Sequence, residues 1–177
     1  MAGKRWLSDR EMYAWIGYRR MRLLLDLALQ RDLASQSGLS EADYDVLSSL
    51  SQAPGQRMRL SDLARHMRWS ASRLSHQITR MQQRGLVDRE ECADDGRGSM
   101  LVLIADGIAA IEAAAPGHVA SVRKYFIDLL SPEELDVLGA LTHRVVDRLQ
   151  SRDDRAGTSP LPARADPSSR GGARRKT

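Results

Sequence analysis

The sequence has few of the residues that build disulfide frameworks, thiolate metal cages or membrane spans. Its 177 residues include a single cysteine, Cys92, which excludes an internal disulfide and argues against a metal site built from thiolates. The longest apolar run near the start, residues 23–25, is far shorter than the ~20 apolar residues that a membrane-spanning helix needs. Residues 1–11 carry charges where a signal peptide has its apolar stretch. We therefore expect a cytoplasmic protein with no membrane segment, no metal and no cofactor.

Lysine is also scarce, and the abundant arginines are unevenly placed. Residues 1–150 hold as many acidic as basic residues, so the net charge of +4 belongs to the C-terminal end of the chain. Within the neutral part, residues 55–87 contain seven arginines and one acid, Asp62. This local excess of positive charge suits a polyanion, and a solvated helical face is the alternative interpretation.

Two long amphipathic patterns flank the arginine-rich stretch. Apolar residues at three- and four-residue spacing predict a helix from Ser8 to about Ala34, which Ser-Gln-Ser-Gly at 35–38 should break. A helical pattern returns at Asp106 and continues to Leu130, and Pro116-Gly117 is expected to kink or divide it. Ser131 then caps a last helix, with proline at its first position and leucines to residue 149. Neither terminal helix can bury its apolar stripe on so small a body, so we predict a homodimer.

Between these patterns the sequence predicts a helix-turn-helix. Ser40 caps a helix that ends at residues 53–55, and residues 58–60 form a short strand. Ser61 is expected to cap the first helix of the pair, and Ser70 the second, which ends at a left-handed Gly85. The second helix is expected to bury Ala71, Leu74, Ile78 and Met81.

A β-hairpin is predicted directly after this helix pair. Residues 86–89 begin one strand, residues 93–99 form a charged loop with two glycines, and residues 100–104 form a β-branched second strand. Arg97, at the tip, suits the negative potential of a narrow minor groove, and Asp95 is placed to orient it; a solvated tip is the alternative.

The predicted fold is therefore mainly α (α+β by strict count), with a winged helix-turn-helix between long dimerisation helices. The expected parts are an N-terminal dimerisation helix in residues 1–35, the winged helix-turn-helix in 36–104, C-terminal dimerisation helices in 105–152 and a disordered basic tail in 153–177.

The polar face of the second helix is the candidate DNA-reading surface. A helix fits the major groove, where arginine and glutamine form paired hydrogen bonds with guanine and adenine. Serine hydroxyls and the free N–H groups of a helix start suit phosphate oxygens. A solvated face is again the alternative. Arg84 lies on the same polar face. The candidate DNA-binding residues are Ser70, Ser72, Arg73, His76, Gln77, Arg80 and, from the hairpin, Arg97.

Residues 60–107 resemble the winged-helix core of the MarR family of bacterial transcription regulators. The shared features are Leu63-Ala64, Ser70-x-Ser72, Gly85-Leu86-Val87, Asp95-x-Arg97 and the strand that runs into Asp106-Gly107. With the flanking helices the resemblance covers residues 8–150. It departs from the family pattern at Ala105, where a capping threonine is common, and at Gly96, where a second basic residue is frequent.

The resemblance implies a homodimer whose first and last helices intertwine, bound to double-stranded DNA at a palindromic operator. It also implies a repressor that a small aromatic effector releases from DNA. Trp15, Tyr18 and Tyr44 lie near the expected junction of the dimerisation and DNA-binding parts and are candidate effector-binding residues. Packing in the dimer core is the alternative role for each of these aromatic side chains.

Other functions find little support in the residues. Ser75 and His76 are adjacent on a helix and point about 100° apart, so they cannot act as a nucleophile and its base, and no phosphate-binding glycine loop is present. We therefore expect no enzyme. Acidic neighbours disfavour the thiolate of Cys92 and a redox role. The remaining alternative is a weakly specific nucleic-acid-associating protein without an effector, which salt dependence and the specificity ratio would distinguish.

Overall fold

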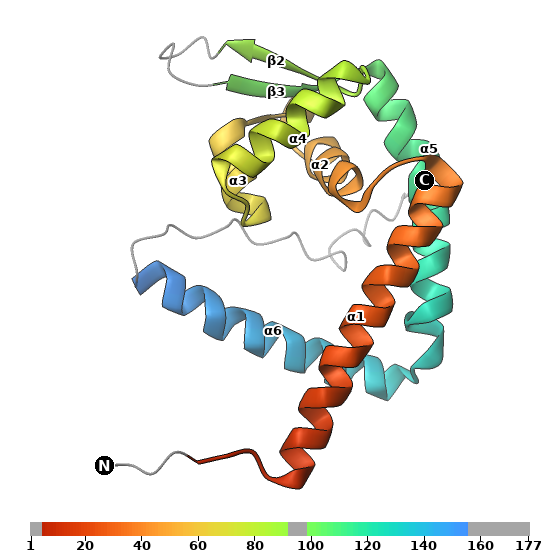
Figure 1. Ribbon diagram of the computed structural model, residues 1–177, viewed down its shortest axis with the longest axis vertical. Helices are drawn as coiled ribbons and strands as arrows, with labels where there is room; N and C mark the ends of the chain where they lie inside the picture. Colours follow the sequence, from red (N-terminus) through yellow and green to blue (C-terminus); the bar gives the residue numbers. More distant parts are fainter. Residues whose placement is uncertain (1–4, 92–98, 156–177) are drawn as a thin grey trace, which may run out of the picture. The chain divides into compact units, whose positions relative to one another are not determined.

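The computed structural model describes residues 5–91 and 99–155. The order of helix, helix, hairpin and long flanking helices is confirmed (Figure 1). The elements are α1 (Asp9–Ser37), α2 (Glu41–Ser51), the 3-10 helix η1 (Pro54–Gln56), β1 (Arg57–Arg59), α3 (Leu60–Met67), α4 (Ala71–Gln83), β2 (Val87–Glu91), β3 (Ser99–Leu103), α5 (Ala105–Tyr125), the 3-10 helix η2 (Ile127–Leu129) and α6 (Pro132–Arg155). The chain divides into two compact units, the first ending at Asp136 and the second beginning at Val137 within α6.

A small sheet forms the base of the predicted hairpin. The strand order is β1-β3-β2, and both pairs are antiparallel. Val87 faces Leu103 at the inner end of the β2–β3 pair, and Arg59 faces Met100 in the β1–β3 pair. The strand before the helix-turn-helix therefore pairs with the second strand of the hairpin. The hairpin tip, residues 92–98, lies outside the described residues.

The hydrophobic core lies among α2, α3, α4 and the sheet, with the start of α5 against it. Its buried members are Leu33, Leu39, Val46, Leu47, Leu50, Leu63, Ala64, Leu74, Ile78, Met81, Leu86, Val87, Leu101, Leu103, Ile111 and Ala114. Three of the four positions predicted as buried on α4 are confirmed, whereas Ala71 is exposed because it occupies the first turn, beyond the reach of α2 and the sheet. At the start of α5, a Cβ on Gly107 would lie 2.0 Å from the carbonyl oxygen of Leu86, so the two backbones touch.

Several predicted helix boundaries need correction. Helix α1 does not break at residue 35: the Ser37 hydroxyl bonds within the helix to the Leu33 carbonyl (2.8 Å), and the helix ends at Gly38, whose φ of 68° is left-handed. Ser61 is not a cap, because β1 pairs as far as Arg59 and α3 begins at Leu60. The caps at Ser40, Ser70 and Ser131 are confirmed, as is the left-handed Gly85.

The helix after the hairpin is not divided at Pro116. Helix α5 runs unbroken to Tyr125 and ends there, short of the predicted Leu130. It packs along α1, and the Ser121 hydroxyl donates a hydrogen bond to the carboxylate of Asp32 (2.8 Å). Packing along α1 thus sustains the helix where proline removes one backbone hydrogen bond. The cap position at its start is occupied by Ile104 and not by Ala105, which is the first residue of the helix, and among the described residues no side chain caps it.

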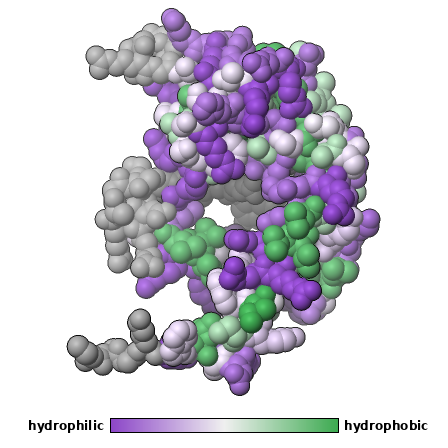
Figure 2. Space-filling view, in the orientation of Figure 1, coloured by the Kyte–Doolittle hydropathy of each residue, from purple (hydrophilic) through white to green (hydrophobic). Residues whose placement is uncertain are grey.

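Helix α1 and the residues before it expose many apolar side chains (Figure 2). In α1, Leu33 is buried. The exposed ones are Trp6, Leu7, Met12, Tyr13, Trp15, Ile16, Tyr18, Met21, Leu23, Leu24 and Leu27.

In the second unit, α6 extends to Arg155, three residues beyond the predicted end, and residues 156–177 lie outside the described part of the chain. It exposes Val137, Leu141, Val145, Val146 and Leu149. None of the helices in residues 5–91 and 99–155 combines the length and apolar character needed to cross a membrane.

Candidate nucleic-acid interface

Helix α4 is held on its inner side and displays polar side chains on its outer side. The Ser70 hydroxyl accepts a hydrogen bond from the backbone N–H of Arg73 (3.2 Å), which caps the helix, while Leu74, Ile78 and Met81 are fully buried. From β2, the Arg89 guanidinium donates to the Ser75 carbonyl (3.0 Å). The candidate residues Ser72, Arg73, His76 and Arg80 are among the exposed side chains of α4, as the sequence predicted.

Arg73 lies over an aromatic ring at the start of α4. Its guanidinium carbon is 4.0 Å from the centre of the Trp69 ring. Trp69 is half-buried in the turn between α3 and α4, and its backbone N–H bonds to the Ala64 carbonyl (3.0 Å). A cation–π contact of this kind contributes about 0.5–1 kcal/mol at an exposed site and keeps the charge on the arginine. The ring therefore gives Arg73 a preferred direction without neutralising it.

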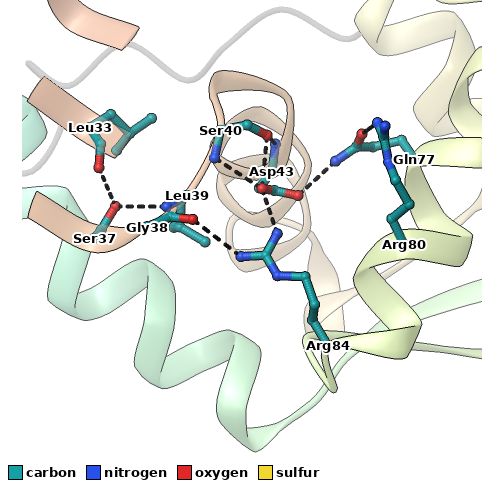
Figure 3. A network of polar contacts seen from close by, with 9 residues as sticks. All are labelled: Leu33, Ser37, Gly38, Leu39, Ser40, Asp43, Gln77, Arg80 and Arg84. Atoms are coloured by element: carbon teal, nitrogen blue, oxygen red, sulfur yellow. Dashed lines mark hydrogen bonds and ion pairs between the residues drawn. The ribbon is translucent and has the colours of Figure 1, made fainter. Parts of the chain in front are cut away.

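Gln77 does not stand on the exposed face, which corrects the sequence prediction. Its side chain is buried (3% exposed), and its amide nitrogen donates to Asp43 Oδ1 on α2 (2.7 Å; Figure 3). Around the helix, Gln77 lies midway between Arg73 and Met81, so it sits at the edge of the buried stripe, where α2 covers it. On its other side, the amide oxygen accepts a hydrogen bond from Arg80.

Asp43 is the centre of this polar network, and the sequence analysis did not single it out as a functional residue. Its Oδ2 atom accepts from the Ser40 backbone N–H (3.0 Å), the Ser40 hydroxyl (2.8 Å) and the Arg84 guanidinium (2.7 Å). Burial raises the pKa of the Asp43 carboxyl. The hydrogen bonds from Arg84 and Ser40, with the positive charge of Arg84, outweigh burial and hold that pKa below its ordinary value of 3.8.

The positive patch is smaller than the arginine count predicts. Arg84 turns inward to Asp43 and also donates to the carbonyl of Gly38 (3.4 Å). Arg57 pairs with Glu90, and Arg65 pairs with Asp62 (2.9 Å). Asp43 and Glu90 lie outside residues 55–87. The charge count over that stretch therefore did not include the acidic partners of Arg84 and Arg57. Arg73 and Arg80, in contrast, contact the neutral side chains of Trp69 and Gln77, and the charge of Asp45 also acts on Arg73.

The candidate effector residues do not form one cluster. The rings of Trp15 and Tyr18 stack on the exposed side of α1, with centroids 5.9 Å apart. The Tyr44 ring instead lies 4.3 Å from the ring of His118 on α5. Burial and the negative charge of Asp45 raise the pKa of the Tyr44 hydroxyl. The His118 Nδ1 atom is buried without a hydrogen-bond partner within the described part of the chain, and sequence reasoning gave His118 no role.

A cleft of about 580 Å³ opens between the C-terminal half of α1 and the start of α2. Its lining residues are Leu27, Gln30, Arg31, Ala34, Ser40, Glu41 and Ala42.

Residues 5–91 and 99–155 contain no group of three His, Cys, Asp or Glu side chains placed to hold a metal ion. The hairpin residues Asp95 and Arg97, together with Cys92, lie outside the described residues.

Comparison with known proteins gives one consistent result. A profile of the MarR family matches residues 37–98. The crystal structure of AbsC, a MarR family transcriptional regulator from Streptomyces coelicolor, has 44% identity over 84% of this chain and 99% of that chain, with a TM-score of 0.80.

Two further structures are DNA complexes. Sco3205, a MarR family transcriptional regulator from Streptomyces coelicolor in complex with DNA, has 35% identity, covers 85% of this chain and 94% of that one, and gives a TM-score of 0.80. A mutant of MarR from E. coli complexed with operator DNA shares the fold at 19% identity, with a TM-score of 0.68 over 80% of this chain and 99% of that chain.

Proposed function

Because the chain belongs to the MarR family of transcription regulators, we propose that it binds double-stranded DNA sequence-specifically as a homodimer on a palindromic operator. In this proposal α4 enters the major groove, and each subunit reads one half-site. The half-sites are then about 10 bp apart or a multiple of one turn apart, related by a dyad. The protein acts as a repressor that a small aromatic effector releases.

The observation that carries this proposal is the outer face of α4. Arg73 and Arg80 are exposed, and each contacts a neutral side chain, Trp69 or Gln77, that favours one direction of the guanidinium group. Arginine is the side chain that most often recognises guanine in the major groove. Ser70 and Ser72, at the start of α4, suit phosphate oxygens, and His76 lies between the two arginines on the exposed face. The 35%-identical Sco3205 was crystallised with DNA, which supports the same use here.

The exposed apolar side chains of α1 and α6 support the homodimer. Each helix presents more large apolar side chains to solvent than a stable monomer normally leaves uncovered. A second copy of the chain offers the same stripes and covers both in a symmetric interface.

Selection of bound sites from a random-sequence DNA pool tests the DNA-binding proposal. We expect an inverted-repeat site that the protein prefers over random DNA by 10³-fold or more at physiological salt. Binding that falls steeply with salt and shows no preferred sequence would instead favour the weakly specific nucleic-acid-associating protein.

The Tyr44–His118 pair is the place where we propose that an aromatic effector binds. Within the described part of the chain the buried Nδ1 of His118 has no partner, so it can form a hydrogen bond with a ligand, and the tyrosine ring offers a stacking surface. Trp15 and Tyr18 complete such a site only if the dimer brings them to it. Titration with a panel of aromatic carboxylic acids should release the protein from its selected site, and His118→Ala should weaken this release. A panel without effect would restrict the function to DNA binding.

A further inference from the structure

We propose that Gln77 is a positioning residue that sets the direction of Arg80 for base recognition, and that Asp43 on α2 fixes Gln77 in the required orientation. This inference rests on the proposed DNA-binding function. It assigns to Gln77 a role different from the direct base contact that its residue type predicts.

The chemistry of the two side chains permits only one orientation of the Gln77 amide. An ionised carboxylate accepts hydrogen bonds and donates none, so the amide must present its nitrogen to Asp43 Oδ1 (2.7 Å). Because the other carboxylate oxygen already accepts from Ser40 and Arg84, Asp43 is held in place. The Gln77 oxygen then points the other way, and as an acceptor it takes a donor, the Arg80 guanidinium.

Burial separates the two roles along the helix. Gln77 is 3% exposed, so its amide cannot reach a base edge, whereas Arg80 is exposed one turn further along α4. Arginine has five N–H donors, and the bond to Gln77 starts from its Nη2 atom. The remaining donors stay available for a guanine or a phosphate. Pre-orientation of this kind lowers the entropy lost when a flexible side chain binds.

The network also ties this direction to the start of α2. Ser40 is the N-cap of α2, and Arg84 joins Asp43 to the carbonyl of Gly38 at the end of α1 (Figure 3). Arg80 is therefore oriented through a chain of hydrogen bonds that begins at the α1–α2 junction, rather than by α4 alone.

A double-mutant cycle on full-length protein tests the inference, with the selected DNA site and single-base variants of it as probes. Gln77→Met keeps the side-chain length and removes both amide partners. We expect about a tenfold loss in the ratio of affinities for the selected site and its best-discriminated variant, within the range for one base contact. In an Arg80→Ala background the same substitution should change this ratio by less than about twofold. Gln52→Met, at an exposed position directly after α2, is the matched control and should leave the ratio unchanged.

A charge-conserving exchange guards against a purely structural effect. Asp43→Asn alone should lower the ratio, because the asparagine leaves the Gln77 amide free to turn over. In the double variant Asp43→Asn with Gln77→Glu, we expect the asparagine nitrogen to donate to the new carboxylate. The other oxygen of this carboxylate again accepts from Arg80. We therefore expect the double variant to regain most of the lost specificity, which general destabilisation would not produce.

Three results would overturn the inference: an unchanged ratio in Gln77→Met, an equal loss with and without Arg80, or no recovery in the exchange variant. The wild-type protein distinguishes these failures from failure of the proposed function. If wild type selects no DNA sequence, the function and the inference fall together; if it selects one and the cycle shows no coupling, only the inference falls.

Discussion

At the scale of single residues, the one buried charge among residues 5–91 and 99–151 belongs to Asp43, whose side chain is only 5% exposed. A carboxylate so deeply buried is tolerated because four hydrogen bonds to its oxygens replace the lost water. An asparagine in its place has only one acceptor oxygen, so either Arg84 or the Gln77 amide loses its acceptor, which is costly even though Arg84 itself is partly exposed.

The lowered pKa of Asp43 predicts how the stability of the protein depends on pH. Because the folded-state pKa is below the unfolded value, the stabilisation is fully present above the unfolded pKa and is lost as pH falls through the folded one. At neutral pH, Asp43→Asn should lower the free energy of unfolding by about 1–3 kcal/mol. Urea unfolding of both proteins from pH 7 to pH 3 should show this difference constant above about pH 5 and shrinking below about pH 4. A difference that grows in acid would contradict the assignment.

Arg73 carries the second residue-scale prediction. Arg73→Ala should reduce affinity for the selected site by about 1–3 kcal/mol and relax the preference at one base position. Trp69→Leu should cause a smaller loss, about 0.5–1 kcal/mol, which Trp69→Phe largely restores because the ring is kept. Competition binding with selected and random DNA measures both. An equal loss on the two DNAs would assign Arg73 to a phosphate.

At the scale of elements, the caps were predictable and the long-range contacts were not. Ser40, Ser70 and Ser131 each bond within their own first turn, so four adjacent residues contain the whole signal. Ser61 has the same residue type but fails, because pairing of β1 with a strand some 40 residues away decides where α3 begins. The partner of Gln77 is Asp43, which lies on another helix. Helical periodicity places Gln77 at the edge of the buried face of α4, but it does not tell which element covers that edge.

The close contact between Leu86, which follows α4, and Gly107, near the start of α5, predicts the effect of a substitution on stability. In Gly107→Ala the new methyl group would meet the backbone carbonyl of Leu86 at 2.0 Å, and backbone cannot rotate away as a side chain can. We expect a loss of about 2–4 kcal/mol in the free energy of unfolding. Ala109→Ser, two residues further on an exposed side of the same helix, should change it by less than about 0.5 kcal/mol. Thermal and urea unfolding measure both, and equal stabilities would show that α5 shifts at little cost.

At the scale of the whole molecule, the proposed homodimer accounts for the exposed apolar side chains of α1 and α6. We expect sedimentation at micromolar concentration to give about 39 kDa, twice the 19.7 kDa of the chain. Val145→Asp, on the apolar stripe of α6, should shift the protein toward monomer because it places a charge in the interface. Ala140→Asp, on the opposite side of α6, is the control. A mass near 20 kDa for wild type would refute the dimer.

The pairing of β1 with β3 has a consequence for the order of folding. Arg59 pairs with Met100, some 40 residues further along the chain, so this ladder closes a loop that contains both helices of the pair and the first hairpin strand. Closing so long a loop loses chain entropy before any stabilising contact forms. We therefore expect the ladder to form late in folding. We expect its backbone hydrogen bonds to open only when the helix pair itself unfolds. The β1–β3 pairing thus joins the two ends of the winged-helix part. The amide protons that form its hydrogen bonds should exchange with solvent at the rate of global unfolding.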